Sequence, residues 1–251
     1  MEYAIITGTS KGLGEAISEA FLRLGVSVIG IARQTNKRLQ TLANDLEADY
    51  QHVNCNLADS DQIDRTFDKI IDQVFKSDTE RVYLINNAAT VSPTDVAHQH
   101  TIEAIEAHMQ VNLIAPMITT SLVLKAGYKK GIPVRVSNVT SGAANRSTYG
   151  WSAYGASKAG LDRYTETVAF EASELEADHK ITLFDPSVMD TNMQSVIRSK
   201  SKDAFKDVEQ FKALKETEQL RDTKTVAGVC VSVLMDDNIE NGKTYSIKDY
   251  V

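Results

Sequence analysis

Cysteine, proline and long apolar runs are scarce in this 251-residue chain, and each scarcity excludes a class of protein. The two cysteines, Cys55 and Cys230, are too few for a disulfide framework and lack the spacing of a zinc site, so we expect reduced, buried thiols. No run approaches the ~20 apolar residues that span a membrane, and no basic leader precedes the first apolar stretch. We therefore expect a cytoplasmic protein without a membrane partner.

Basic residues are also in the minority. Lysine and arginine number 27 against 34 aspartates and glutamates, which gives a formal net charge of -7. Because nucleic acids attract basic surfaces, we expect no nucleic-acid partner. His98 and His100 have no third ligand near them in the sequence, and their surroundings are typical of a polar loop rather than a metal site.

Short apolar strands alternate with amphipathic helices along the whole chain. The pattern predicts one α/β domain over residues 1–251, with a doubly wound, Rossmann-type parallel sheet of seven strands and helices on both faces. Pro116 lies inside a helical pattern, where it should bend or break the helix. The expected strands are 3–7, 26–31, 51–53, 81–85, 134–139, 181–184 and 244–247. The expected helices after the first are 37–46, 59–75, 102–126, 153–175 and 223–234.

One segment interrupts the alternation. Residues 189–220 separate the sixth strand from the last helix and carry apolar residues spread among many charges. A connection of this length in a globular domain is usually functional. Because it follows the carboxyl end of a strand, we expect it to cover a ligand crevice as a substrate lid.

A glycine-rich turn joins the first strand to the first helix. A helix that begins directly after such a turn points its free N–H groups at a phosphate, and glycines let the backbone approach closely. The segment therefore predicts a dinucleotide-binding loop. Its candidate cofactor contacts are Gly8, Ser10, Lys11, Gly12, Leu13 and Gly14.

Tyr154 and Lys158 are four residues apart and therefore share one face of the expected helix 153–175. A lysine ammonium beside a phenol favours the phenolate, so we expect Lys158 to lower the pKa of Tyr154. The pair is a candidate acid and base for moving a proton to or from a carbonyl or alcohol oxygen.

With these motifs the chain resembles the short-chain dehydrogenase/reductase family. The turn at 7–14 has the family's T-G-x-x-x-G-x-G form, and Asn86-Asn87-Ala88 matches its N-N-A element. Asn112 stands in a V-N-L element, and Ser141 precedes Tyr154 by the usual 13 residues. The resemblance implies a catalytic tetrad of Asn112, Ser141, Tyr154 and Lys158.

The resemblance also implies roles. Ser141 orients the substrate carbonyl, Tyr154 protonates its oxygen, and Lys158 holds the nicotinamide ribose. Asn112 holds a water that links Lys158 to solvent. Residues 186–191 match the family's P-G-x-x-x-T turn. The further cofactor contacts implied are Asn54, Asn87, Ala88, Pro186, Val188 and Thr191.

The end of the second strand bears on the choice of cofactor. NAD enzymes of this layout carry an acid there for the ribose 2′-hydroxyl, whereas this chain has Arg33. Its planar guanidinium suits a phosphate, and Lys11 in the glycine loop adds a second cation. We therefore expect NADP(H).

The chain departs from the family pattern at three positions. Asn54 stands where an aspartate is usual, and Ala89 and Ser187 each replace a glycine. None of these changes removes a catalytic group, but each makes the local geometry uncertain to read from sequence.

Within the family the chain resembles the sepiapterin reductase branch, and most of all its bacterial benzil reductases. The similarity lies in Gly150-Trp151, in 189–194, in 220–224 and in the C-terminal 241–249. Ser246 stands where pterin-reducing members carry an acid, which favours a 1,2-diketone over a pterin. The candidate substrate residues are Ser141, Trp151, Tyr154, Met189 and Met193.

Three alternatives stay open at this point. The same tetrad serves pterin side-chain reductases and 3-oxoacyl reductases. A binding protein that senses NADP(H) without catalysis is the third, although such proteins typically lack the Tyr154 and Lys158 pair. Helices 102–126 and 153–175 form the family's usual interface, so the resemblance implies a homodimer or homotetramer.

Overall fold

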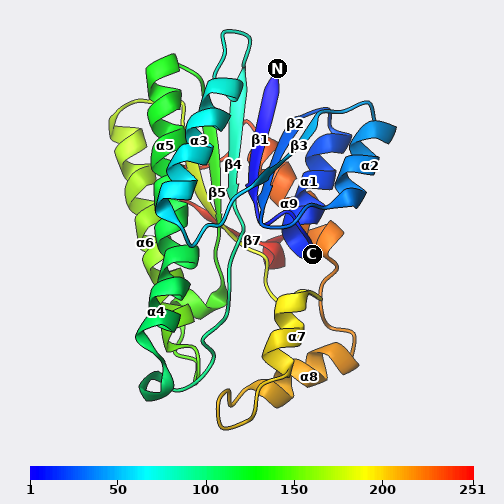
Figure 1. The fold of residues 1–251 in the computed structure, drawn as a ribbon, viewed down its shortest axis with the longest axis vertical. Coiled ribbons are helices and arrows are strands. Elements are labelled where there is room, and N and C mark those ends of the chain that lie inside the picture. The colour runs from blue at the N-terminus through cyan, green and yellow to red at the C-terminus, as the bar shows by residue number, and fades with distance from the viewer.

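A parallel sheet of seven strands forms the middle layer of the computed structural model, which describes residues 1–251 (Figure 1). The strand order β3-β2-β1-β4-β5-β6-β7 confirms the doubly wound topology. Because the chain reverses direction across the sheet after β3, the crevice of the switch point lies at the carboxyl ends of β1 and β4. The strands are β1 Glu2–Thr7, β2 Ser27–Ala32, β3 Tyr50–Asn54, β4 Arg81–Asn86, β5 Val134–Val139, β6 Lys180–Asp185 and β7 Thr244–Ser246.

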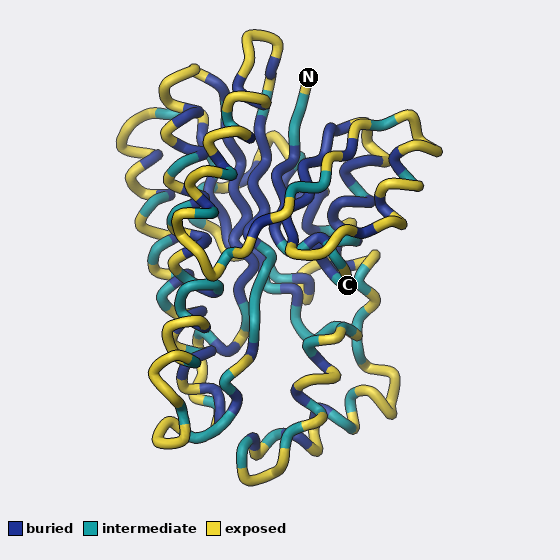
Figure 2. The backbone as a smooth tube through the Cα atoms, viewed as in Figure 1, coloured by how far each residue is buried: buried dark blue, intermediate teal, exposed yellow.

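Helices cover both faces of the sheet, whose strands are mostly buried (Figure 2). Two hydrophobic clusters fill the spaces between the layers. In β1, Ala4 and Ile6 belong to one cluster and Ile5 to the other, as the alternation of side chains along a strand requires. One face packs on α1 Gly12–Arg23, α2 Lys37–Asp45 and α9 Thr223–Met235. The other face packs on α3 Ser60–Val74, α5 Ala115–Lys130 and α6 Ser152–Glu174.

The helix expected over 102–126 extends to Lys130 and does not break at Pro116. Instead α4 Ile102–Met109 continues through a π-helical turn, Gln110–Ile114, into α5. Proline cannot donate to the carbonyl oxygen four residues earlier, which is that of Asn112, and a wider turn accommodates the missing bond. The turn therefore sets the position of Asn112.

The continuous stretch Ile102–Lys130 is long and apolar enough, by composition, to cross a membrane, which we did not expect. Its neighbours in the structure are α3, α6 and the strands β4 and β5. The side chains of Val123 and Leu124 lie in the hydrophobic cluster beneath it. The apolar side chains on this face of the helix therefore pack against the domain's own sheet.

The segment after β6 extends beyond the carboxyl ends of the strands (Figure 1). It contains two short helices, α7 Asn192–Arg198 and α8 Val208–Glu216. Phe205, between them, is fully buried, and with Val208 and Phe211 it joins a third hydrophobic cluster, which also contains Tyr154. The segment thus packs directly against the catalytic helix.

Candidate active site

Glycine lets the loop between β1 and α1 pack more closely on itself and on the segment after β4 than side chains would allow. A Cβ atom on Gly14 would lie 2.4 Å from the carbonyl oxygen of Gly8, and one on Gly8 would lie 2.9 Å from Asn87 Nδ2. Gly8 also has a φ of +79°, which other residues rarely adopt. No side chain caps the first turn of α1, so its N–H groups stay available to an anion. The loop therefore fits a dinucleotide pyrophosphate.

The N-N-A element fastens this loop to the sheet. Asn87 Nδ2 donates to the carbonyl oxygen of Thr7 at 2.9 Å, and the N–H groups of Asn87 and Ala88 donate to Thr7 Oγ1 at 3.0 and 3.1 Å. Asn86 Nδ2 donates to Asn138 Oδ1 at 2.8 Å, which joins β4 to β5. These buried and partly buried bonds fix the floor of the crevice.

Arg33 follows the carboxyl end of β2, and Lys11 is the N-cap residue of α1. Both side chains are exposed, and neither forms an ion pair. Asn54 Nδ2 donates to the carbonyl oxygen of Arg33 at 2.9 Å, so the amide that replaces the usual aspartate holds the end of β2. The two cations are therefore free to bind a phosphate.

The turn after β6 closes the other side of the loop. Ser187 has a φ of +56°, in the left-handed region that favours glycine, which explains why this position is usually glycine. Thr191 faces the loop, because its Cγ2 would lie 3.6 Å from a Cβ atom on Gly12. Pro186 is buried, and the carbonyl oxygen of Val188 accepts from Arg221 N at 3.1 Å.

Tyr154 and Lys158 share the buried face of α6, as their spacing predicts, with 6% and 3% of their surfaces exposed. Lys158 Nζ lies 6.0 Å from the centre of the tyrosine ring and donates to the carbonyl oxygen of Val139 at 2.7 Å. Burial lowers the pKa of Lys158 to about 8, and the carboxylate of Asp162 counters part of that effect. The ammonium is therefore held between the strand end and the catalytic helix.

The expected fall in the pKa of Tyr154 is wrong for the protein on its own. Burial raises the pKa of this phenol above its ordinary value; the hydroxyl of Ser141 counters part of the rise, and the charge of Asp185 adds to it. The cost of removing a phenolate from water is the largest cause and therefore sets the direction of the pKa shift. Tyr154 consequently holds its proton, as a proton donor must.

Asn112 and Ser141 lie on either side of this pair. Asn112 Oδ1 accepts from Thr90 N, and Asn112 Nδ2 donates to the carbonyl oxygen of Thr90, both at 2.8 Å. The asparagine side chain thus holds the segment after β4 in place. It forms no hydrogen bond with Lys158. Ser141 follows β5, and its Oγ accepts from Ala143 N at 3.2 Å.

Aromatic rings pack beside the phenol. Trp151 stacks on Phe205 with ring centroids 4.7 Å apart and meets the ring of Tyr154 at 5.1 Å. Met193, a candidate substrate residue, and Val188, a candidate cofactor contact, pack against the same cluster. Met189, which we expected there as well, packs instead against the cluster between α1, α9 and the sheet.

Gly150 explains how the segment after β6 reaches these rings. Its φ is +87°, and a Cβ atom there would lie 2.0 Å from the carbonyl oxygen of Ala204. Only glycine lets the backbone beside Phe205 approach so closely. The Gly150-Trp151 pair therefore acts as a docking point for that segment.

Comparison with known proteins decides the family. The model for "short chain dehydrogenase" matches residues 2–202. The chain belongs to the short-chain dehydrogenase family. As a member it is an oxidoreductase that acts on carbonyl or hydroxyl groups with a nicotinamide cofactor.

Individual relatives extend this similarity to the whole chain. The chain is 36% identical over 249 residues to a benzil reductase ((S)-benzoin forming) of Bacillus cereus, covering 99% of this chain and 100% of the relative. It is 38% identical over 255 residues to that of Bacillus subtilis, covering both chains fully. The solved structure of the KRED1-Pglu enzyme superposes with a TM-score of 0.81 at 25% identity, covering 98% of this chain and 100% of that one.

This short-chain dehydrogenase has two site residues that the sequence patterns did not indicate, and the first is His108. His108 is fully buried, and its Nδ1 lies 2.7 Å from the carbonyl oxygen of Ser92. Because that oxygen only accepts, Nδ1 carries the proton and Nε2 is left to accept from Asn112 Nδ2 at 3.1 Å. Burial lowers the pKa of His108, which keeps the ring neutral in this arrangement. The spacing of four residues between His108 and Asn112 in a helix was the available signal.

Asp162 is a second missed residue. It continues the helical face of Tyr154 and Lys158 by one more turn and accepts a hydrogen bond from the hydroxyl of Thr140. Burial raises the pKa of Asp162, and the positive charge of Lys158 counters part of the rise. Its spacing from Lys158 was visible in the sequence, but its partner on the neighbouring strand end was not.

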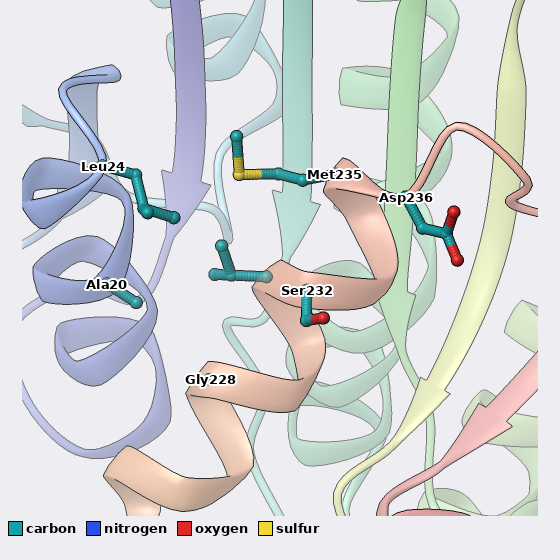
Figure 3. Close-up of a pocket in the computed structure, with 7 residues that line it drawn as sticks. Ala20, Leu24, Gly228, Ser232, Met235 and Asp236 are labelled. Atoms are coloured by element: carbon teal, nitrogen blue, oxygen red, sulfur yellow. The ribbon is translucent and has the colours of Figure 1, made fainter.

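A separate hollow of about 510 Å³ lies between α1 and α9 (Figure 3). It includes Leu24 and Met235, at the carboxyl ends of these helices. Helices that run antiparallel to the strands end at the amino edge of the sheet. The hollow is therefore at the edge opposite to Tyr154 and has no part in the site.

We predict that His108→Asn lowers kcat about tenfold, because an asparagine amide can replace Nδ1 toward Ser92 but removes Nε2, one of the acceptors of the Asn112 amide. His108→Gln offers an oxygen near the place of Nε2 and should restore most of kcat. Steady-state kinetics and melting temperatures of both variants check this. If both variants melt at lower temperatures by the same amount and keep the wild-type kcat, His108 has only a structural role.

Proposed function

We propose that this enzyme reduces one carbonyl of a 1,2-diketone to a hydroxyketone, of the type benzil to (S)-benzoin, with NADPH as the cofactor. The observation that carries the proposal is the aromatic cluster of Trp151, Phe205 and Phe211 packed against the proton donor Tyr154. Aromatic rings offer large apolar contact surfaces to other rings. The similarity to two benzil reductases over the full chain supports the same substrate class.

The chemistry follows from the positions of the side chains. Ser141 donates a hydrogen bond to the carbonyl oxygen and orients it beside Tyr154. The nicotinamide supplies, when bound, the hydride for the carbonyl carbon. The phenol of Tyr154 gives its proton to the oxygen as negative charge develops there, a contribution that is worth ~10²–10⁴ in rate in enzymes generally. The ammonium of Lys158 then stabilises the phenolate that remains.

Reprotonation of Tyr154 requires a path from solvent. The side chain of Asn112 is occupied by Thr90 and His108, so a relay water would have to bind the backbone carbonyl oxygen of Asn112. Pro116 cannot donate to that oxygen, which favours this use of it. The π-helical turn thus supports the proton-relay role proposed for Asn112.

The segment 189–220 is proposed to act as a substrate lid. Phe205 and Phe211 of this segment pack against the ring of Trp151, the N-cap residue of α6. Such contacts can open without loss of the main core, because they belong to a separate hydrophobic cluster. The lid would then exclude water from Tyr154 when it closes on an apolar substrate.

We also propose a homodimer and a cytoplasmic location. The outer faces of α5 and α6 expose Met117, Tyr128 and Phe170, and a hollow of about 680 Å³ lies between these helices. Exposed apolar side chains of this kind mark interaction surfaces. The two buried free cysteines, Cys55 and Cys230, support a reducing compartment.

We predict that the purified protein oxidises NADPH faster with benzil than with sepiapterin or an acetoacetyl thioester, because an apolar aromatic site suits benzil best. Absorbance at 340 nm measures this. Tyr154→Phe should lose at least ~10²-fold in kcat and keep its affinity for NADPH. Tyr164→Phe, which removes a hydroxyl from the same helix outside the site, is the matched control.

The other outcomes discriminate between functions. Preference for sepiapterin would assign the enzyme to pterin chemistry despite the neutral Ser246. Turnover of the thioester alone would favour a 3-oxoacyl reductase. Binding of NADPH without turnover of any of the three would favour a sensor.

We predict that Arg33→Ala raises the KM for NADPH about tenfold or more and leaves that for NADH nearly unchanged, because a charge-assisted bond to the 2′-phosphate is lost. Michaelis constants for both cofactors check this. Lys69→Ala removes an equivalent charge from the exposed side of α3 and controls for net charge. A wild-type preference for NADH would refute the assignment of NADPH.

A further inference from the structure

Trp151 carries a buried hydrogen-bond donor that no group of the protein accepts. Its indole Nε1 has no partner, although only 6% of the residue is exposed. The rings that bury it, Phe205 at 4.7 Å and Phe211 at 5.6 Å between centroids, offer carbon surfaces and no acceptor. Buried tryptophan N–H groups normally find a partner, so an unpaired one points to a ligand that supplies the acceptor.

The unpaired donor belongs to a residue that directly contacts the proton donor. Trp151 is the N-cap residue of α6, and Tyr154 lies in the first turn of that helix. Their ring centroids are 5.1 Å apart, at 63° between the planes. Both residues are in the same hydrophobic cluster. Because the two rings are in contact, a ligand that accepts from both donors must carry two acceptors that lie close together.

A 1,2-diketone meets this requirement, and a simple ketone does not. One carbonyl oxygen accepts from Tyr154 and Ser141, and the second carbonyl oxygen keeps its lone pairs for another donor. We propose that Trp151 Nε1 donates a hydrogen bond to this second oxygen and thereby selects vicinal dicarbonyls over monoketones. The inference rests on the proposed function, because it names the feature of the diketone that the site recognises, its second carbonyl oxygen.

The physical basis of the selection is the cost of leaving the indole unpaired. A substrate without the second oxygen leaves this N–H buried and without an acceptor, and sites built around such donors discriminate against substrates that lack the partner. The bond also withdraws electron density from the adjacent carbonyl carbon, which receives the hydride. The bond should therefore raise kcat/KM for diketones and leave that for monoketones unchanged.

The single tryptophan of the chain allows a direct test. Growth of a tryptophan auxotroph on β-(3-benzothienyl)alanine replaces Trp151 alone by an isostere with sulfur in place of the N–H group. Benzil and deoxybenzoin, which has the same two phenyl rings but one carbonyl, are compared by kcat/KM with NADPH. We expect the ratio of benzil to deoxybenzoin to fall about threefold to tenfold, since a neutral hydrogen bond is lost.

A ratio that stays unchanged while both rates fall together would overturn the inference and leave the reductase function intact. Reduction of neither ketone by the unsubstituted enzyme would instead refute the proposed function and this inference with it. Gln194, in the lid, also has a buried donor without an acceptor, its Nε2. If Gln194→Met loses the preference for diketones and the benzothienyl enzyme keeps it, the hydrogen bond belongs to Gln194. That result would overturn the inference for Trp151.

A second measurement does not depend on the folding of a variant. Because there is one tryptophan, the ¹⁵N-labelled enzyme gives one indole Nε1–H signal. In the presence of NADP⁺, which prevents reduction, saturation with benzil should move this proton downfield, and deoxybenzoin should not. Equal shifts with both ketones would contradict the proposed bond.

Discussion

The burial of Tyr154 and Lys158 on one face of α6 is the constraint on which the rest of the site depends. Burial opposes charge on both groups, which raises the pKa of the phenol and lowers that of the ammonium to about 8. The site therefore needs Asp162 and the carbonyl oxygen of Val139 to keep Lys158 protonated. A tyrosine that keeps its proton is suited to carbonyl reduction, in which the phenol gives that proton away.

Three parts of the fold produce this burial together. The carboxyl ends of β4 and β5 place Asn87 and Ser141 at the edge where the glycine loop turns into α1. The π-helical turn brings Asn112 against the segment after β4. The segment after β6 supplies Phe205, whose ring covers Trp151 beside the phenol. The same edge can therefore hold a polar cofactor and an apolar substrate, because each is bound by a different part of the chain.

The sequence predicted what short-range patterns determine. Apolar runs and helical periodicity gave the seven strands and the helices on both faces, and the spacing of Tyr154 and Lys158 placed them together. The pKa of Tyr154 was mispredicted in direction, because it depends on burial by Phe205, which is 51 residues away. His108 was missed because its partner Ser92 lies on another segment. Met189 packs on the core rather than at the site, and the spacing of apolar residues in the sequence does not distinguish these two positions.

The most direct test of the account is the ionisation of Tyr154 in the protein without cofactor. Tyrosine labelled with ¹³C at Cζ reports the phenolate by its chemical shift, and Tyr154→Phe assigns the signal among the nine tyrosines. Because burial raises the pKa, Tyr154 should remain protonated up to at least pH 10, the ordinary value of the phenol. Ionisation between pH 6 and pH 8, roughly the working range of such an enzyme, would show that the charge of Lys158 outweighs burial and would contradict the account.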